Sequence, residues 1–473
     1  MKSIKLKNKN KTNKTNKTKT NKNKKVSQLI NITIPDKMRI LSNKIGKSIS
    51  SKKKVKSKSK SKSKARIGHS NSGFNESSYS ASSVKHSFKM DKTKLFEELI
   101  KISKSFTCKD INESRIKEHL GSGVTNRVDL FCVDTGCKLK AACRFMPISK
   151  NYPINSSHPV NVEIAIYKIF NKLNTPHVPI LYKNLKCHYT DVLVGDDIIS
   201  QYKDQIDMGE ITENLNIMLL EFCEGGSLKD FINKYKYNIT YLTCAIFQVL
   251  ASLTILQVKL KNFRHNDLHN NNIAIGNYHF PNEETYIKNL KKNKGKKYYI
   301  CYEMLGTKFY IPYLGFCIKI FDFDVSCADG IPNSKVRIDT VYKDNGVICR
   351  GNAKFDAHLS INSPFHSLAG YDEGFFSGIL SSKSAKIHKK MLDFYNRSVP
   401  LDYRGFNSAK LGYARVKEIT NFPKELKTAI ELLQDSLFID YRTLPTDGDI
   451  IWTYHTGIED LTSLKKTRKK IKI

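Results

Sequence analysis

A long apolar run from Tyr241 to Leu260 is the feature that most limits what this chain of 473 residues can fold into. Its length matches a membrane-spanning helix, but a span of about 20 residues should be almost free of polar side chains. This run is interrupted by four of them: Gln248, Ser252, Gln257 and Lys259. We therefore expect a helix that is buried on all sides within a soluble domain, and no contact with a membrane.

The first 90 residues differ in composition from the rest of the chain. They contain 26 Lys and Arg residues against two acidic ones, while the net charge of the whole sequence is +36. Residues 1–25 are almost only Lys, Asn and Thr, and residues 50–64 alternate Ser with Lys. Such segments bury too little apolar area to offset the entropy lost when a chain is ordered. The sequence thus predicts a disordered basic tail over residues 1–90.

The charge of this tail suits non-specific binding to the phosphates of a nucleic acid. Stacking on bases is not expected, because residues 1–64 contain no Phe, Tyr or Trp. Two basic runs, Lys52–Lys56 and Lys465–Lys470, are typical of nuclear-localisation signals. The alternative is that these lysines are solvated and have no dedicated partner.

Eleven cysteines are scattered singly between Cys108 and Cys349, without a C-x-x-C pair. An odd number of isolated cysteines in a long chain predicts reduced thiols, not a disulfide framework or a zinc site. The lysines near the N-terminus are not followed by an apolar stretch, which argues against a secretory signal. We expect an intracellular protein.

Hydrophobic periodicity divides the remaining sequence into a strand-rich and a helix-rich part. Before residue 225 it predicts a helix near Leu95, a second over Val160–Leu173, and a series of strands. These strands are Arg115–Leu120, Val128–Val133, Leu139–Phe145, Val178–Leu185 and Asn216–Phe222. Seven acidic residues within 191–213 favour a surface insertion there. From residue 225 onward the pattern is mainly helical, so the chain predicts an α+β fold.

Two glycine-containing segments follow predicted strands. Gly121 and Gly123 lie between the first two strands, where the absence of a Cβ lets the backbone approach phosphate groups closely. Residues Glu221 to Gly226 connect a buried strand to a predicted helix over Leu228–Tyr235. Each segment taken alone is also consistent with an ordinary turn.

The polar loop from His265 to Asn272 follows the long apolar helix. Asp267 and Asn272 lie five residues apart, a spacing at which the carboxylate can accept a hydroxyl proton while the amide oxygen binds Mg²⁺. His265 and His269 are spaced like a pair of metal ligands, but no Glu adjoins His265, which argues against zinc.

A further acidic position ends the apolar run Ile318–Phe321. Asp322 there suits a phosphate-bound Mg²⁺, because a carboxylate is a hard oxygen ligand. Taken alone, an acid at the end of a strand is usually a turn residue.

In their order and spacing, these segments resemble the protein-kinase-like superfamily over about residues 111–370. Gly121, Gly123 and Val128 resemble the glycine-rich loop G-x-G-x-x-G-x-V. The segment from Glu221 to Gly226 resembles the hinge of the family.

The catalytic segments carry the same resemblance. His265, Asp267 and Asn272 resemble H-R-D-x-x-x-x-N, and Asp322 with Phe323 resembles D-F-G. The Lys/Asn-rich character of the sequence is also similar to that of serine/threonine-protein kinases of large DNA viruses. For such a protein we expect a location in the host cytoplasm, the nucleus or the virion.

The resemblance implies a two-lobed kinase-like fold with ATP bound between the lobes. The N-lobe would span residues 91–224 and the C-lobe residues 225–473, with an insertion at about 276–316. Asn272 and Asp322 would hold Mg²⁺, and Asp267 would orient a hydroxyl of a protein substrate. The residues implied for ATP binding are Leu120, Gly121, Ser122, Gly123, Val128, Lys140, Arg144, Glu163, Glu221 and Cys223.

The main departure from the family concerns the lysine of the third strand. The sequence aligns Arg144 with that lysine and Glu163 with its ion-pair partner. Lys140 is an alternative, because residues 140, 142 and 144 share one face of a strand, and Lys138 is a weaker one. Arg does not replace Lys without consequence, so a catalytically weak pseudokinase that acts as a basic binding module is one alternative function.

Other departures lie in the loops. Asn126 replaces the third glycine, and Asn266 replaces the arginine that pairs with a phosphorylated activation loop in the family. His269 and Asp324 are similar to residues of choline and aminoglycoside kinases, so a small-molecule kinase is a second alternative. Asp356 is a candidate for the helix residue that supports the catalytic loop, or else an ordinary helix acid.

Overall fold

The computed structural model describes residues 92–122, 126–173, 175–192, 195–293, 295–304, 306–339, 347–367, 385–400 and 426–456. The chain divides into two units, residues 1–85 and 86–473, and every described residue belongs to the second. The predicted basic tail, Gly123 and the run Lys465–Lys470 lie outside the described residues. Their predictions stay untested.

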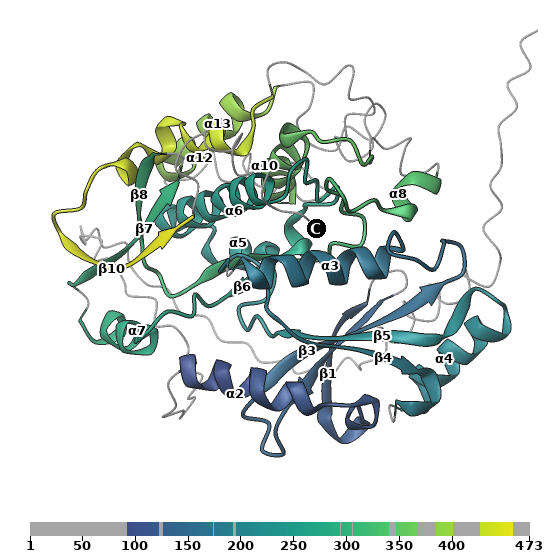
Figure 1. The fold of residues 1–473 in the computed structure, drawn as a ribbon. Helices are drawn as coiled ribbons and strands as arrows, with labels where there is room; N and C mark the ends of the chain where they lie inside the picture. The colour runs from purple at the N-terminus through teal and green to yellow at the C-terminus, as the bar shows by residue number, and fades with distance from the viewer. Residues whose placement is uncertain are drawn as a thin grey trace, which may run out of the picture. The chain divides into compact units, whose positions relative to one another are not determined.

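An antiparallel five-stranded sheet forms the first part of the described chain (Figure 1). Successive residues of β5 point to opposite faces: Ile217 and Leu219 join one apolar cluster, Met218 and Leu220 another. This period of two lets both faces carry a helix. The strands are β1 (Ile116–Ser122), β2 (Arg127–Cys132), β3 (Lys140–Ser149), β4 (Leu181–His188) and β5 (Ile211–Glu221), in the order β1-β2-β3-β5-β4.

Helices α2 (Lys92–Ser105) and α3 (Pro159–Lys172) lie on opposite faces of this sheet (Figure 1). The ring of His158 accepts from the backbone N–H of Val160, and a proline in the first turn favours the start of α3. The predicted strands and both predicted helices are confirmed, with ends shifted by a few residues.

The predicted surface insertion over residues 191–213 is corrected by the structure. It contains α4 (Asp196–Asp207) and the start of β5. Its many acidic residues obscured the helical pattern, and its Tyr202 is buried against the sheet.

The predicted apolar helix is α6 (Ile239–Lys259), and it occupies the core of the second part of the chain. Every residue from Leu242 to Leu256 is buried. The helix is long and apolar enough to cross a membrane, but 83% of its apolar window is buried within the protein. Further helices among the described residues of this part are α5 (Leu228–Tyr235), α8 (Ser334–Ile338), α10 (Ala353–Ser367), α12 (Ala385–Ser398) and α13 (Ala429–Leu433).

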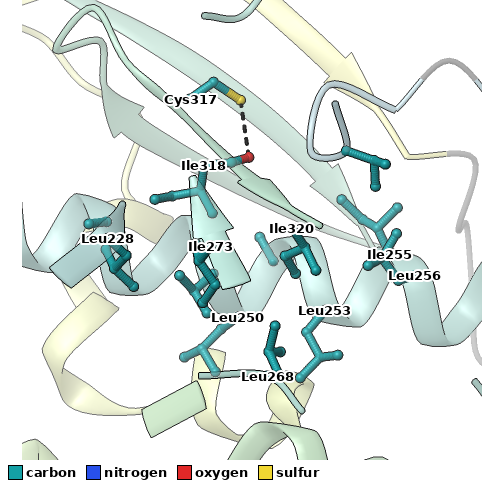
Figure 2. Close-up of a cluster of buried hydrophobic side chains, with 14 of the residues drawn as sticks. Leu228, Leu250, Leu253, Ile255, Leu256, Leu268, Ile273, Cys317, Ile318 and Ile320 are labelled. Atoms are coloured by element: carbon teal, nitrogen blue, oxygen red, sulfur yellow. Dashed lines mark hydrogen bonds between the residues drawn. The ribbon is translucent and has the colours of Figure 1, made fainter. Parts of the chain in front are cut away.

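A two-stranded antiparallel ribbon packs on α6. It consists of β6 (Ile273–Gly276) and β9 (Cys317–Ile320). Figure 2 shows Ile273 and Ile320 of the ribbon among leucines such as Leu250 of the helix. The ribbon holds the loop that precedes β6 beside the loop that follows β9.

The predicted insertion at 276–316 contains α7 (Glu283–Lys292), β7 (Lys297–Met304) and β8 (Thr307–Pro312). β7 also pairs in parallel with β10 (Gly448–His455). The expectation of mainly helical structure from residue 225 onward therefore misses β10. Its partner strand lies far back in the chain, so local periodicity does not reveal the pairing.

The expectation of reduced cysteines is also wrong for six of them. The structure contains the disulfides Cys108–Cys187, Cys132–Cys137 and Cys327–Cys349. Two of these join residues 79 and 22 positions apart. Only the tertiary fold brings such partners together, so spacing in the sequence does not predict the bonds.

Candidate functional site

A pocket of about 990 Å³ lies between the five-stranded sheet and the loops around β6 and β9. This volume is in the range of sites for small molecules and cofactors. Ten of the predicted site residues line it: Leu120, Gly121, Ser122, Val128, Arg144, Glu221, Cys223, Asp267, Asn272 and Asp322. Lys140 and Glu163 are not among the lining residues.

Arg144 of β3 connects the sheet to α3 and to the loop after β9. Its Nη1 lies 3.2 Å from a Glu163 carboxylate oxygen, and its Nη2 donates to Asp322 Oδ1 at 2.6 Å. The expected pair of Arg144 with Glu163 is thus present. Arg144 and Glu163 are almost fully buried, whereas Asp322 is 30% exposed. The planar guanidinium can serve both carboxylates at once, which an ammonium group does less well.

The pKa values of the two carboxylates in this cluster are shifted in opposite directions. Burial raises the pKa of Glu163 to about 8, because Arg144 only partly offsets the loss of solvation. Burial also opposes ionisation of Asp322, but the closer Arg144 guanidinium outweighs it and holds the pKa of Asp322 below its usual range. Of these two acids, Asp322 is therefore the one whose charged form the protein favours.

Asp356 of α10 binds the backbone of the loop that contains Asp267. The two carboxylate oxygens of Asp356 accept the backbone N–H groups of His265 and Asn266 at 2.7 and 2.9 Å. His265 Nε2 donates to the carbonyl of Phe321 at 2.8 Å, which ties this loop to the one after β9. Asn266 adopts the left-handed conformation (φ 68°), which Asn tolerates better than most residues. Asp356 therefore supports this loop in the way expected from the sequence.

Asp267 and Asn272 lie together at one wall of the pocket. The amide nitrogen of Asn272 donates to the Asp267 carbonyl at 2.8 Å and to its carboxylate at 3.2 Å. This arrangement leaves the amide oxygen of Asn272 as a ligand for a cation. His269 Nε2 lies 3.4 Å from the same Asp267 carboxylate oxygen.

The aromatic ring after Asp322 fixes the position of this acid. Phe323 is fully buried, and its ring contacts those of Tyr167 and Phe170 in α3 at centroid distances of 5.0 and 6.0 Å. Asp322 itself has a φ of 68°, a strained value for a residue other than glycine. Strain at a pocket-lining acid is typical of functional sites.

Asp324 stands where the family has glycine, and it lines the same pocket. Its carboxylate binds Lys335 Nζ at 2.6 Å, and its carbonyl accepts from the side chain of Asn333 at 2.8 Å. Burial and the neighbouring Asp322 charge raise the pKa of Asp324.

Glu221 lines the pocket, but its side chain binds two basic residues of the protein. Its carboxylate is buried and binds Lys319 Nζ at 2.9 Å and His279 Nε2 at 2.6 Å. Burial alone would raise the pKa of Glu221, but Lys319 and His279 together lower it to about 2. The side chain is therefore occupied within the protein, and the Glu221 backbone N–H is also paired, because it donates to the carbonyl of Ile180 at 2.8 Å.

The glycine-containing turn after β5 is tightly packed. A Cβ on Gly225 would lie 2.5 Å from the side chain of Ile275 in β6, so a larger residue does not fit there. The turn thus brings β6 directly against the segment Glu221–Cys223 at the edge of the pocket.

A polar network lies at the end of β1. His119 Nδ1 meets the buried carboxylate of Asp129 at 2.9 Å, and His119 Nε2 meets Ser122 Oγ at 2.9 Å. One extra residue on β1 between His119 and Gly121 changes the register against β2. Such a bulge brings Ser122 to the same face as His119.

One of the comparisons with known proteins agrees with the resemblance noted above. No family model matches the chain. Among curated proteins it is similar to "Putative serine/threonine-protein kinase R400" of Acanthamoeba polyphaga mimivirus, with 29% identity over 301 residues. The match covers 60% of this chain and 59% of the relative, so the chain spans less than two thirds of the relative's length. The chain resembles a viral protein kinase.

Three residues of this kinase-like site were missed by sequence reasoning: Lys319, His279 and Lys335. A signal for Lys319 was available, because a lysine between Ile318 and Ile320 in an apolar strand needs a buried acid. His279 and Lys335 left no such signal, because they reach Glu221 and Asp324 only through the tertiary fold.

Proposed function

We propose that this protein is an ATP-dependent phosphotransferase with the two-lobed kinase fold, and that it transfers the γ-phosphate of ATP to a serine or threonine hydroxyl of a protein. The observation that carries the proposal is the convergence of Asp267, Asn272 and Asp322 on one pocket that Arg144 also lines. The similarity to a viral protein named as a kinase supports it.

The residues of the pocket fit a magnesium nucleotide. The carboxylate of Asp322 and the amide oxygen of Asn272 are hard oxygen ligands, the type that Mg²⁺ takes in phosphate sites. When bound, the metal would neutralise charge on the phosphates. Gly121 and Ser122 line the same space, as do Glu221, Phe222 and Cys223.

The protein groups then have separate tasks. The Asp267 carboxylate accepts a hydrogen bond from the acceptor hydroxyl and orients its oxygen toward the phosphorus. The Arg144 guanidinium supplies positive charge beside the phosphates and keeps Asp322 in place. Catalysis of this type depends mainly on positioning and charge neutralisation.

A small-molecule kinase is the second candidate. The specific observation in its favour is Asp324, which adds a carboxylate to the pocket where the protein kinases have glycine. Such a carboxylate suits a cationic acceptor such as an amino alcohol. We rank it below the protein kinase because the named relative is a serine/threonine-protein kinase.

A transfer assay with γ-labelled ATP and Mg²⁺ tests the proposal. Casein, a basic protein and a set of amino alcohols serve as acceptors, and Asp322→Asn serves as the control variant. Labelled serine or threonine in a protein, lost with Asp322→Asn, supports the proposal. Label only in an amino alcohol favours the second candidate, and ATP binding without any transfer shows a pseudokinase.

For its partners and location we propose an unidentified protein substrate, non-specific nucleic acid at the basic tail, and an intracellular or virion site. The tail carries +24 of the total charge of +36, which is the reason for the nucleic-acid proposal.

A further inference from the structure

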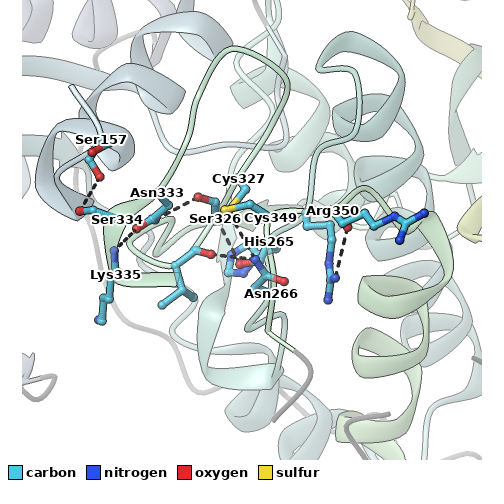
Figure 3. Close-up of a disulfide and its surroundings, with 12 residues drawn as sticks. Ser157, His265, Asn266, Ser326, Cys327, Asn333, Ser334, Lys335, Cys349 and Arg350 are labelled. Atoms are coloured by element: carbon cyan, nitrogen blue, oxygen red, sulfur yellow. Dashed lines mark hydrogen bonds between the residues drawn. A yellow bond between two sulfur atoms is a disulfide. The ribbon is translucent and has the colours of Figure 1, made fainter. Parts of the chain in front are cut away.

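The disulfide Cys327–Cys349 links two cysteines that both follow Asp322 in the chain. It lies beside His265 and Asn266 of the catalytic loop (Figure 3). Cys327 is fully buried, whereas Cys349 is exposed. The two cysteines are 22 positions apart, and the pocket residue Val347 lies two positions before Cys349.

Cys327 is attached to the catalytic loop through its backbone. Its carbonyl accepts from the N–H of Arg264 at 2.8 Å, and its N–H donates to the carbonyl of Arg264 at 2.9 Å. The next residue along the loop, His265, accepts from the hydroxyl of Ser326 at 3.2 Å. This end of the disulfide is therefore rigidly placed.

Asn266 strengthens the same attachment. Its side-chain amide donates to the carbonyl of Val325 at 2.9 Å. The family places an arginine at this position to hold a phosphorylated loop, whereas this chain has a neutral side chain that holds unmodified backbone. The neutral side chain of Asn266 therefore provides no positive charge for a phosphorylated residue. The segment after Asp324 is instead held by the disulfide of Cys327, three residues further along the chain.

The described residues 327–339, which follow the first cysteine of the disulfide, also reach the pocket and α3. Ser334 donates its N–H and its hydroxyl to the carbonyl of Ser157, just before α3, at 2.8 and 2.9 Å. The neighbouring Lys335 binds the pocket acid Asp324. A change at the disulfide thus acts on elements that touch the catalytic loop, α3 and the pocket.

We propose that Cys327–Cys349 is a reversible redox site, and that its oxidised form holds the protein in the conformation competent for phosphoryl transfer. This inference rests on the proposed function. The disulfide replaces the clamp that loop phosphorylation provides elsewhere in the family, so the chemical partner of the site is a dithiol or a disulfide rather than a kinase.

The disulfide opens by thiol–disulfide exchange. A thiolate of a dithiol attacks the exposed Cys349 sulfur, the S–S bond breaks, and Cys327 leaves as a thiolate that takes up a proton. The second thiol of the reagent then displaces Cys349 as a thiol. Two electrons pass to the protein, and the reagent ends as a disulfide. A disulfide reagent such as oxidised glutathione runs the exchange in the reverse direction.

The experiment compares the wild type, Cys349→Ser and Cys137→Ser after treatment with oxidised glutathione or with dithiothreitol. Cys137→Ser is the matched control, because it removes a disulfide that closes a separation of only five residues away from the catalytic loop. Thiol alkylation and mass spectrometry establish which disulfides are open. Thermal melting shows that each variant is folded.

We expect reduction to lower kcat/KM of the wild type for a protein acceptor by about 10- to 100-fold, the loss typical of a displaced catalytic group. Cys349→Ser should have this low activity under both conditions, and Cys137→Ser should respond like the wild type. Full activity of folded Cys349→Ser, or no response of the wild type to complete reduction, overturns the proposal.

Hydrogen exchange separates this inference from the proposed function. The amides of His265 and Asn266 should exchange faster in the reduced wild type and in Cys349→Ser than in the oxidised wild type. Equal exchange in all three overturns the clamp even if the protein transfers no phosphate. Faster exchange without any transfer in either state leaves the clamp supported and the kinase proposal refuted.

Discussion

Arg144 shows how one residue can determine the geometry of the site and its departure from the family at the same time. Its guanidinium is shared by Glu163 and Asp322, two acids from different elements. A lysine ammonium presents its donors from a single atom, so it reaches both acids less well. The cluster therefore depends on arginine for its architecture, even if lysine suits phosphate chemistry better.

The first prediction follows from this difference between arginine and lysine at position 144. Arg144→Lys should preserve or raise turnover, while Arg144→Ala should lose turnover and destabilise the fold by about 1–3 kcal/mol, because it leaves the buried Glu163 carboxyl without a partner. Steady-state kinetics and urea unfolding measure both. Lys140→Ala is the control and should change little. Loss of ATP binding in Lys140→Ala, with Arg144→Ala silent, would show that Lys140 serves as the family lysine.

Asp267 is the residue for which chemistry and structure can be separated best. Asp267→Asn keeps its size but removes the carboxylate that accepts the hydroxyl hydrogen bond, so kcat should fall by about 10²–10⁴-fold. The affinity for a fluorescent ATP analogue should remain within a few-fold. Single-turnover transfer and fluorescence titration test the two expectations. Unchanged turnover in a preparation free of other kinases contradicts the proposed mechanism.

At the scale of elements, the buried pair Glu221–Lys319 connects β5 to β9. Lys319 is fully buried and Glu221 nearly so. Removing Glu221 leaves the Lys319 charge buried and uncompensated, and removing Lys319 leaves Glu221 with only His279 to offset its charge. Removing both side-chain charges avoids this imbalance. The pair therefore tests whether two elements from different parts of the chain depend on each other.

We predict that Glu221→Gln and Lys319→Met each lower the free energy of unfolding by about 3–5 kcal/mol at pH 7. The double variant should lie closer to the wild type. Urea unfolding of all four proteins forms a double-mutant cycle. Strictly additive losses would mean that the two side chains do not stabilise each other.

The carboxylate of Glu221 also makes the free energy of unfolding depend on pH. Its pKa is about 2 in the folded protein and about 4.3 in an unfolded chain, so its contribution to stability is complete above the unfolded value and is lost as the pH falls toward 2. The difference in unfolding free energy between the wild type and Glu221→Gln should therefore shrink between about pH 4.3 and 2. A constant difference over this range would contradict the assignment.

The elements that could be predicted from the sequence are those with local periodicity. The five strands of the sheet and the helices α3, α5 and α6 follow from alternation or from apolar spacing. β10 and the disulfides Cys108–Cys187 and Cys327–Cys349 depend on contacts between distant residues, which no local pattern encodes. A lysine in the apolar strand β9 indicates a buried acid, but the pattern does not identify Glu221 as that acid. The pocket was predictable to the same extent: its loops carry motifs, but Lys335 and His279 reach it only through packing.

At the scale of the whole molecule, most of the charge lies outside the described fold. Residues 1–85 form a unit separate from the rest. Deleting residues 1–89 should leave the melting temperature within a few degrees, because changes away from the core typically alter stability by about 0.5 kcal/mol or less. It should abolish most binding to nucleic acid at about 50 mM salt, where counterion release dominates.

Thermal melting and an electrophoretic mobility shift on both proteins check this prediction. A large fall in melting temperature would mean that the folded unit depends on the deleted residues. Unchanged binding to nucleic acid would assign the basic surface to residues 288–297 or to Lys465–Lys470.

The parallel pairing of β10 with β7 determines when the fold can be completed during synthesis. Trp452 and Tyr454 of β10 cover Tyr278 and Tyr302, at ring distances of 5.7 and 5.8 Å. A ribosome adding about 5–20 residues per second needs roughly 8–30 s to proceed from β7 to the end of β10. Throughout that interval the nascent chain displays an aromatic surface without its cover. This aromatic surface is therefore the part of the fold that we expect a chaperone to bind until His455 has left the ribosome.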